Sequence, residues 1–487
     1  MIRARARAFL LLATALAGCS VGPDYRPRTA AELGVPDGYS VAAPRTPEDL
    51  TRWWRRFEDP VLGQLVEQAR ANNVDVAQAV ARIRQAREAL VQSRSQLLPT
   101  IGGSAGYNRS LNLVGGTSNL TLPDGTVTTI SRNAGDSFSL GLDAQYQLGL
   151  FGEVRRTVEA TRAEEQASGY DYASVLISVE SEVARNYVLA RALQAQAANA
   201  RASLAIQDDN LEIAGFRVQA GLVSSTDVEQ ARAQRAQTAA TIPQIDEQYA
   251  AAVARLGVLT GRAPGALRAA IAPARPIPAG PQAVGIGIPA DTLRQRPDVL
   301  SAERALAAAT ARIGVAKAQL YPALAISGNI QTNATSIGNI GQAITGGLFA
   351  GLTQAIFNGG RLRSQVRSAQ AATDAAFASY KGAVLLALED VENAIVALDA
   401  ARQREAQFRI AYTAATNSAI LARSQYRTGL TDFTTLNHQE TALLSAQNGL
   451  TQARADQASA TVALYAALGG GWDAGAVSAA TASSGTN

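Results

Sequence analysis

The sequence has one cysteine, Cys19, and one histidine, His438, among 487 residues. A single cysteine excludes an intrachain disulfide. With only one histidine beside it, the chain lacks the donors of a conventional His/Cys metal site. Carboxylates are scattered over predicted helix faces, and no pair is placed by spacing for acid–base work. We therefore predict no metal, no cofactor and no enzymatic activity.

Aromatic residues are also scarce, at 5% against 47% hydrophobic residues, and the apolar share is largely Ala, Leu and Val. This composition favours long helices packed through small residues over a large globular core. The formal charge is +4, but Arg3, Arg5 and Arg7 lie in a predicted signal peptide, which leaves the mature chain near +1. The pI of 9.3 is therefore no argument for a nucleic-acid partner.

Long hydrophobic runs are missing as well. Residues 1–18 hold a basic start and an apolar run from Ala8 to Leu16, too short for a transmembrane helix of about 20 residues. This pattern predicts a signal peptide. No later segment has 18 consecutive apolar residues. If the mature chain spans a membrane, we expect it to do so as a β-barrel, in which every backbone group is paired.

The chain contains two transitions from a strand to a very long helix. Residues 137–149 alternate strictly between apolar and polar side chains, which predicts a strand with one apolar face. Leu150-Phe151-Gly152 interrupts the pattern, and a helix is predicted over 153–220. The same order recurs with a strand at 347–357 and a helix at 361–428, whose 4-3 apolar spacing is typical of a coiled coil.

These transitions belong to an internal two-fold repeat. The motif from Asp75 to Pro99 recurs from Asp298 to Pro322, at a constant offset of 223 residues. Two further strands are predicted at 101–112 and 323–331, before the polar loops 113–135 and 332–346. The predicted segments are an N-terminal segment 19–60, a first repeat 61–260, a connector 261–290, a second repeat 291–468 and a tail 469–487.

The boundaries of the helices follow from capping residues. Asp59-Pro60 predicts the start of a helix that continues from 61 to about 98. Gly221 and Gly429 predict left-handed ends for the two long helices. Thr226 and Glu229 form a candidate capping box for a return helix over 226–260. A second return helix is predicted over 432–468.

The four strands predict an oligomer. Membrane barrels begin at eight strands, so one chain cannot close a barrel. An open sheet with a lipid-facing side would leave its edges unpaired. The residues alone do not give the number of chains.

Cys19 follows Leu16-Ala17-Gly18, and the four residues resemble a bacterial lipobox. The resemblance implies that Cys19 becomes the acylated (palmitate-carrying) first residue of a lipoprotein. Ser20, where Asp would mark inner-membrane retention, implies export to the outer membrane. Several acyl chains on one cysteine would anchor the chain firmly.

Taken together, these patterns resemble one family, the TolC-like outer-membrane factors of tripartite efflux systems, in their NodT/OprM-type lipoprotein branch. The matching stretches are Cys19–Tyr25, Trp53–Pro60, Leu293–Val299, Gly314–Pro322 and Ile356–Leu362. The resemblance implies a mainly α chain with membrane β: a trimer with a 12-stranded outer-membrane barrel, four strands from each chain, continued by a 12-helix periplasmic α-barrel. Residues 20–60, 262–290 and the C-terminus would form an equatorial belt.

The resemblance also implies a function. Members are passive exit ducts for drugs and other toxic small molecules in Gram-negative bacteria. They dock a periplasmic adaptor (membrane fusion) protein and an inner-membrane pump, here of the resistance-nodulation-division or major-facilitator type. Two alternatives stay open: the exit duct of a type I protein secretion system, and a structural coiled-coil lipoprotein.

Carried over by position, the family's periplasmic gate lies near Gly221 and Gly429. Thr226 and Asp227 match first-repeat gate residues, and Tyr426 matches a gate tyrosine. Thr431 and Thr435 fall where TolC itself has an arginine and an aspartate, so that ionic latch is missing.

His438 falls where better-known members have an aspartate. Two interpretations stay open for this side chain. It is either an ordinary solvated helix residue or one of three imidazoles that make the charge of the tip titratable between about pH 5 and 8.

Overall fold

The computed structural model describes residues 20–41, 48–111, 113, 117–131, 135–473 and 475. Cys19, the predicted signal peptide and nearly all of the predicted tail after 473 lie outside the described residues. The chain divides into two compact units: residues 1–26, 86–164 and 305–376 form unit 1, and the remaining residues form unit 2. Each unit is described by itself.

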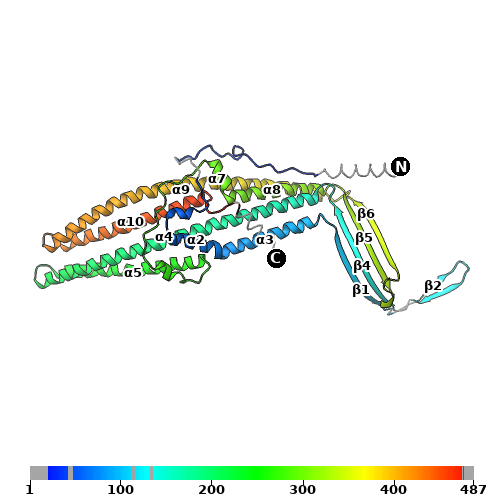
Figure 1. The fold of residues 1–487 in the computed structure, drawn as a ribbon, viewed down its shortest axis with the longest axis horizontal. Helices are drawn as coiled ribbons and strands as arrows, with labels where there is room; N and C mark the ends of the chain where they lie inside the picture. Colours follow the sequence, from blue (N-terminus) through cyan, green and yellow to red (C-terminus); the bar gives the residue numbers. More distant parts are fainter. Residues whose placement is uncertain are drawn as a thin grey trace. The chain divides into compact units, whose positions relative to one another are not determined.

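Unit 1 is built on a four-stranded antiparallel sheet in the order β1 (Thr100–Ser110), β4 (Gly135–Leu148), β5 (Ala323–Ala334) and β6 (Ile344–Thr353) (Figure 1). The predicted strand at 347–357 was placed about three residues too late. The ladder ends at the pair Ala323–Thr353. Pro322, which has no N–H, precedes the partner strand, so residues 354–357 find no strand to pair with.

The register gathers the apolar side chains on one face of this sheet. Leu142 of β4 lies opposite Gly103 of β1 and Ile330 of β5, and Gly328 of β5 lies opposite Leu348 of β6. Because side chains alternate along a strand, each neighbour two positions away falls on the same face. The larger members of this apolar face are Ile101, Tyr107, Phe138, Leu140, Leu142, Tyr146, Leu148, Leu324, Ile326, Ile330, Ile344, Leu348 and Leu352.

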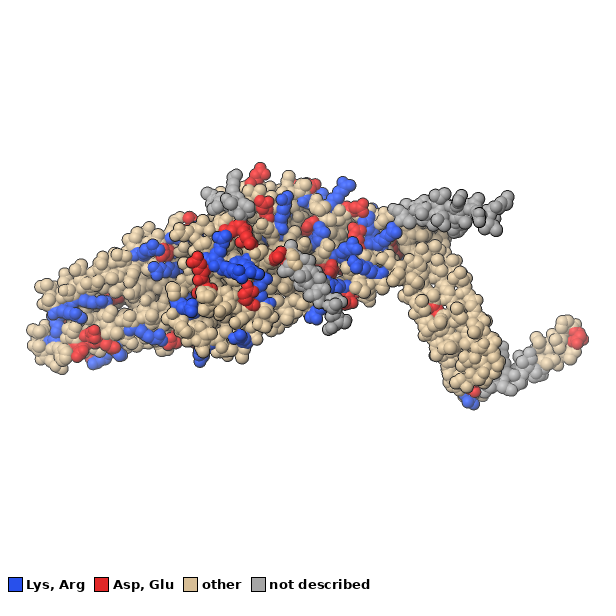
Figure 2. Space-filling model, viewed as in Figure 1, with Lys and Arg blue, Asp and Glu red and all other residues tan. Residues whose placement is uncertain are grey.

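This apolar face is exposed in the single chain, as shown by Ile101 at 75% and Leu348 at 85% exposure. The sheet also carries few charges. Arg109, Asp136 and Asp143 are the charged residues of its four strands, and Figure 2 shows the sheet as a nearly uncharged surface. A large exposed apolar face marks a surface made for a partner or a membrane. None of the described helices is long and apolar enough to cross a bilayer.

The predicted polar loop 113–135 contains a β-hairpin, which is a correction to the prediction. β2 (Thr117–Thr121) pairs with β3 (Val127–Ser131). The connecting turn holds Asp124, whose side chain accepts a hydrogen bond from the Thr126 N–H (3.0 Å). Asp-Gly between two Thr-rich segments is itself a hairpin signal.

Helices dominate the rest of the chain. η1 (Trp53–Phe57), α2 (Pro60–Asn72) and α3 (Val74–Ser95) come first, and α4 (Glu153–Gln219) and α5 (Ser225–Leu259) follow β4. α6 (Arg268–Ile271) and α7 (Pro289–Gln295) lie in and after the connector, before α8 (Pro297–Ala318). The second strand pair is followed by α9 (Arg361–Arg427) and α10 (Phe433–Ala467). α4 and α9 each have 67 residues, and α5 and α10 each have 35.

The predicted single helix from 61 to 98 is interrupted at Asn73. Its backbone is extended, and its side-chain oxygen accepts hydrogen bonds from the N–H groups of Asp75 (2.7 Å) and Val76 (3.1 Å). Its amide nitrogen donates to the Leu259 carbonyl (2.8 Å). Asn73 therefore ends α2, caps α3 and ties both to the end of α5.

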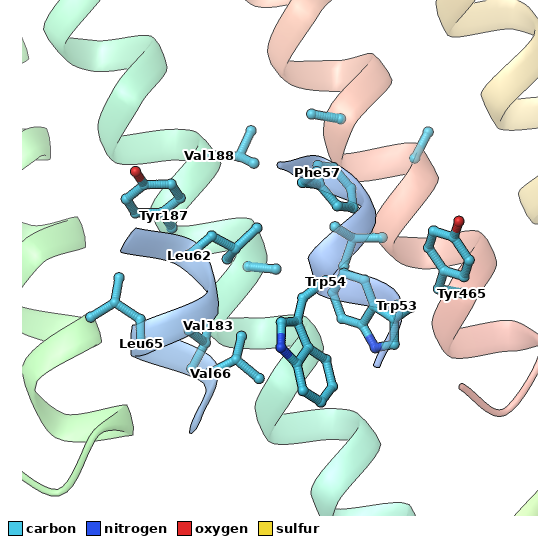
Figure 3. Close-up of a cluster of buried hydrophobic side chains, with 14 of the residues drawn as sticks. Trp53, Trp54, Phe57, Leu62, Leu65, Val66, Val183, Tyr187, Val188 and Tyr465 are labelled. Atoms are coloured by element: carbon cyan, nitrogen blue, oxygen red, sulfur yellow. The ribbon is translucent and has the colours of Figure 1, made fainter. Parts of the chain in front are cut away.

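The core of unit 2 surrounds η1. Trp53, Trp54 and Phe57 pack with residues of α2, α4 and α10, including Leu62, Val183 and Tyr465 (Figure 3). Trp53 stacks on Tyr465 with ring centroids 5.5 Å apart. The predicted cap at Asp59 is confirmed, because its carboxylate accepts hydrogen bonds from the N–H groups of Val61 and Leu62.

Candidate functional site

The candidate site is the pair of helix turns where α4 meets α5 and α9 meets α10. Both turns have the same backbone geometry. Gly221 has φ +69°, its N–H donates to the Val218 carbonyl, and the Leu222 N–H donates to the Arg217 carbonyl. Gly429 has φ +81°, with the equivalent bonds to Tyr426 and Gln425. Positive φ at both positions confirms the predicted left-handed helix ends.

The two return helices begin with different caps. The Ser224 hydroxyl accepts a hydrogen bond from the Thr226 N–H (3.2 Å) and caps α5. The predicted capping box of Thr226 and Glu229 is therefore wrong, and Glu229 instead pairs with Arg232 (2.6 Å). Asp432 caps α10 through the Thr435 N–H (2.7 Å), and this bond lowers the pKa of the Asp432 carboxyl.

Tyr426 forms the centre of an apolar cluster at these turns. It is 1% exposed and packs with Ala231 of α5, Ala422 of α9, and Phe433 and Leu436 of α10. The Phe433 ring stands edge-on to it, with centroids 6.0 Å apart. Its hydroxyl is buried without a hydrogen-bond partner among the described residues, so the ring makes the contacts.

Arg217 joins the two turns, although the sequence interpretation did not single it out. Its guanidinium lies 4.8 Å from the Tyr426 ring centroid, and Nη1 donates to the Tyr426 carbonyl (3.2 Å). Burial raises the pKa of Tyr426, while the Arg217 charge opposes this rise. A basic residue in the last turn of a helix is common for dipole reasons, so the sequence carried no special signal here.

In each hairpin, an ion pair joins the long helix to its return helix. Arg423 of α9 bonds Glu440 of α10 through two nitrogens, and the Nη2–Oε2 distance is 2.7 Å. Glu440 is 4% exposed. In the other hairpin, Arg235 of α5 pairs with Asp208 of α4. These ion pairs hold each return helix against its long helix.

The remaining residues assigned to the gate lie around this cluster. Thr226 is exposed and Asp227 is half-buried in the first turn of α5. Thr431 is half-buried between the Gly429 turn and the cap, while Thr435 and His438 are exposed on α10. Within the described parts of the chain, neither Asp227 nor His438 enters an ion pair. The structure thus brings Tyr426 together with Arg217, and the three α10-side residues stay at the surface.

A small cavity lies among the described residues of the site. The cavity between Gln207, Asn210, Gln234, Asn437 and Glu440 has a volume of about 10 Å³, enough for one water at most. A larger hollow of about 860 Å³ lies elsewhere in unit 2, beside Arg296. The Arg296 guanidinium donates hydrogen bonds to Asp298, to Asp390 and to the Ala467 carbonyl. It therefore joins the start of α8 to α9 and to the end of α10. The described residues hold no group of three or more metal-ligating side chains.

Comparisons with known proteins agree with this architecture. A family model described as outer membrane efflux protein matches residues 65–262 and 288–470. The pyoverdine export outer membrane protein OpmQ of Pseudomonas aeruginosa is 31% identical over 434 residues, which cover 89% of this chain and 90% of OpmQ. Nodulation protein T of Rhizobium leguminosarum bv. trifolii is 31% identical over 480 residues, with 94% and 96% covered.

The structure also resembles a solved channel. The outer-membrane channel OprN superposes with a TM-score of 0.82 and 33% sequence identity, over 93% of this chain and 100% of OprN.

Proposed function

The chain belongs to the outer membrane efflux protein family, and on that basis we propose that it is the outer-membrane exit duct of a tripartite efflux system. The observation that carries the proposal is the sheet of unit 1. Its exposed apolar face and its two unpaired edge strands, β1 and β6, require further strands to complete them.

Three copies would complete the sheet. β1 and β6 run antiparallel to each other, since each neighbouring pair in the order β1-β4-β5-β6 is antiparallel. The β6 edge of one chain can therefore pair with the β1 edge of the next as an ordinary antiparallel ladder. Four strands from each of three chains form a 12-stranded barrel with the apolar face towards lipid. The two pairs of equally long helices, α4 with α9 and α5 with α10, would supply 12 helices to a periplasmic α-barrel, as the family resemblance implies.

We further propose that Cys19 carries the lipid anchor of the mature chain. The support is the lipobox-like sequence Leu16-Ala17-Gly18-Cys19. Several acyl chains on one residue hold a protein to a membrane far more firmly than a single chain does. The anchor would keep each chain at the outer membrane before and after assembly.

The two helix turns are the proposed periplasmic gate. Arg217, Tyr426 and the surrounding apolar cluster support this assignment, because they join the two hairpins of one chain. Opening would separate or rotate the hairpins, which requires the Arg217 contact to break. The aperture would be lined or flanked by the other residues assigned to the gate, Thr226, Asp227, Thr431, Thr435 and His438.

A periplasmic adaptor and an inner-membrane pump would dock at this gate. OpmQ is described as an export protein for pyoverdine, and other relatives as toluene or solvent efflux proteins. We propose export of small molecules for this chain as well. The pump selects the substrate, so no residue of the duct needs to recognise it chemically.

Deletion and complementation test the proposal. Cells that lack the chain should accumulate a fluorescent efflux substrate, and the wild-type chain should restore export. Native mass spectrometry of the extracted protein should give three chains. A protein that stays monomeric after extraction, or whose deletion changes only the secretion of a protein, would contradict the proposal.

A further inference from the structure

The hollow of about 860 Å³ in unit 2 lies where α10 ends and α8 begins, and α4 and α9 also line it. The Arg296 guanidinium, just before α8, donates to the Ala467 carbonyl (3.0 Å). A Cβ on Gly469 would lie 2.9 Å from the Gln295 carbonyl oxygen, so the two helix ends meet closely. Sites for drug-sized molecules have volumes of about 300 to 1,000 Å³, and this hollow falls in that range.

Small side chains leave this space open. The lining alanines of α9 and α10 include Ala394, Ala397, Ala463 and Ala466. The large residues of the same turns of α10, Leu464 and Tyr465, are buried in the core of unit 2 instead. Ile177 of α4 adds a further apolar side chain to the wall. The hollow therefore offers an apolar surface to whatever enters it.

The α4 wall of the hollow carries a buried hydroxyl that has no partner. Two other lining serines bond back to their own helix: the Ser174 hydroxyl donates to the Tyr170 carbonyl (3.2 Å), and the Ser178 hydroxyl donates to the Ser174 carbonyl (3.0 Å). Ser181 is 5% exposed, and its Oγ has no hydrogen-bond partner among the described residues. Because a buried hydroxyl without a partner costs free energy, a bound group that completes its hydrogen bonding is favoured.

The charges that line the hollow leave one cation free. Each acidic lining residue is paired with an arginine: Glu182 with Arg255 of α5, and Asp298 and Asp390 with Arg296. Arg185 of α4 is exposed and enters no ion pair within the described part of the chain. It lies four residues after Ser181, so the two side chains share one face of α4. A hydroxyl and an unpaired guanidinium thus stand side by side on the wall of the hollow.

We propose that this hollow binds small amphipathic carboxylates. The apolar body of the ligand lies against the alanines of α9 and α10, and its carboxylate accepts hydrogen bonds from Arg185 and from the Ser181 hydroxyl. A guanidinium has only donors, in a fork that matches a carboxylate, whereas a cationic ligand would meet acids that are already paired. The site goes beyond the proposed export function, because binding at it requires neither a pump nor transport.

Photo-labelling of the whole protein tests the site. The full-length chain is extracted with its surrounding lipid in polymer-bounded discs and equilibrated with 4-benzoylbenzoate, a photo-reactive aromatic carboxylate. After illumination, mass spectrometry of peptides locates the label. We expect saturable labelling within residues 174–186, 390–397 or 463–467. The uncharged 4-benzoylbenzamide, which has nearly the same shape, should bind there about fivefold more weakly or less.

Arg185→Gln and Arg201→Gln form a matched pair on α4. Arg201 is also exposed, but it pairs with Asp246 and does not line the hollow. Arg185→Gln should weaken binding of the carboxylate by about fivefold or more and leave binding of the amide unchanged, since only the carboxylate uses the charge. Arg201→Gln should leave the binding of both probes as in the wild type.

A second pair of variants tests the apolar wall. Ala397 and Ala400 are both exposed on α9, and Ala397 alone lines the hollow. Ala397→Leu should reduce labelling by both probes, because the added side chain fills the space, and Ala400→Leu should not. Ser181→Ala removes an unpaired hydroxyl, so it should weaken binding of the carboxylate without lowering the thermal midpoint. A purely structural role of Ser181 would give the opposite result.

Three outcomes would overturn the site. They are labelling only outside the three segments, equal binding of the carboxylate and the amide, and wild-type binding in both Arg185→Gln and Ala397→Leu. A neighbouring chain that covers the hollow would give the first of these, or no labelling at all. A chain that binds the carboxylate as expected, but whose deletion leaves efflux unchanged, would refute the proposed export function and not this site.

Discussion

Arg217 at the end of α4 and Tyr426 at the end of α9 form a direct link between the two helix hairpins of one chain. The guanidinium lies 4.8 Å from the ring centroid and donates a hydrogen bond to the Tyr426 carbonyl (3.2 Å). The Tyr426 hydroxyl makes no bond among the described residues. The contact therefore depends on the ring and the backbone, and a gate role for Tyr426 does not need its hydroxyl.

This geometry separates two substitutions at one position. Tyr426→Phe keeps the ring and removes an unpaired hydroxyl, so the conductance of the closed channel in planar bilayers should stay at the wild-type value. Arg217→Leu removes a cation–π contact worth about 0.5 to 2 kcal/mol together with a hydrogen bond, so closed-state conductance should rise. A larger rise in Tyr426→Phe than in Arg217→Leu would contradict this assignment.

The Arg423–Glu440 pair should matter more for stability than its exposed counterparts. Glu440 is 4% exposed, and its removal leaves Arg423 without its bidentate partner. We expect Glu440→Ala to destabilise the α9–α10 hairpin by about 2 to 3 kcal/mol, since Arg423 keeps partial access to water. Hydrogen exchange over residues 415–445 measures this loss.

Glu229 provides the matched control for that experiment. It pairs with Arg232 on the same turn of α5, and both side chains are more than 60% exposed. Glu229→Ala should change the opening free energy measured by hydrogen exchange in the α4–α5 hairpin by less than about 0.5 kcal/mol. Equal effects of the two substitutions would contradict the importance of burial at Glu440.

Glu180 of α4 predicts a pH dependence of stability. Its carboxylate is completely buried beside Arg70 of α2, whose Nη1 also donates to the Gly471 carbonyl (2.8 Å). A Cβ on Gly471 would overlap with the carboxylate, so the C-terminal segment packs directly on it. Burial raises the pKa of Glu180 to about 8, although the Arg70 charge opposes the rise and Glu67 adds to it.

The sign of the effect follows from this raised pKa. Between about pH 4.5 and 8 the folded chain binds a proton that the unfolded chain releases, so this contribution to stability is full at low pH and declines as pH rises through 8. The total change is on the order of 5 kcal/mol. The thermal midpoint of the extracted protein should therefore fall from pH 5 to pH 9, and Glu180→Gln should flatten that fall. An unchanged slope in Glu180→Gln would contradict the assignment.

His438 is exposed on α10 and enters no ion pair within the described chain, a position that both interpretations of its side chain allow. We expect wild type and His438→Asn to show the same dependence of conductance on pH between about 5 and 8, the range in which histidine changes charge. A dependence that disappears in His438→Asn would favour three titratable imidazoles at the aperture instead.

The sequence predicted those parts of the fold that depend on local periodicity. The alternation of residues 137–149 predicted β4, and the left-handed ends followed from Gly221 and Gly429 because glycine alone adopts positive φ without cost. The break at Asn73 was missed, since apolar spacing continues across it. The Asn73 side chain caps the next helix through the N–H groups of Asp75 and Val76. It also donates one hydrogen bond to the carbonyl of Leu259, 186 residues away.

The candidate site was predictable only in part, because some of its contacts join residues far apart in the sequence. Its two turns depend on local sequence, and the sequence predicted both. The true cap of α5, Ser224, lies two residues from another hydroxyl, and only the backbone conformation distinguishes them. Arg217 is part of the site because it contacts Tyr426, which lies 209 residues away in the sequence. No sequence spacing connects the two residues.

Photo-crosslinking in living cells tests the central claim, an exit duct for small-molecule efflux. A photo-reactive residue replaces Ser225 at the first turn of α5, and the same residue at exposed Val258 near the other end of α5 is the control. The account predicts that Ser225, and not Val258, captures a periplasmic adaptor that works with a proton-driven pump. Capture of the adaptor of an ABC protein exporter, or only of further copies of this chain, would contradict it.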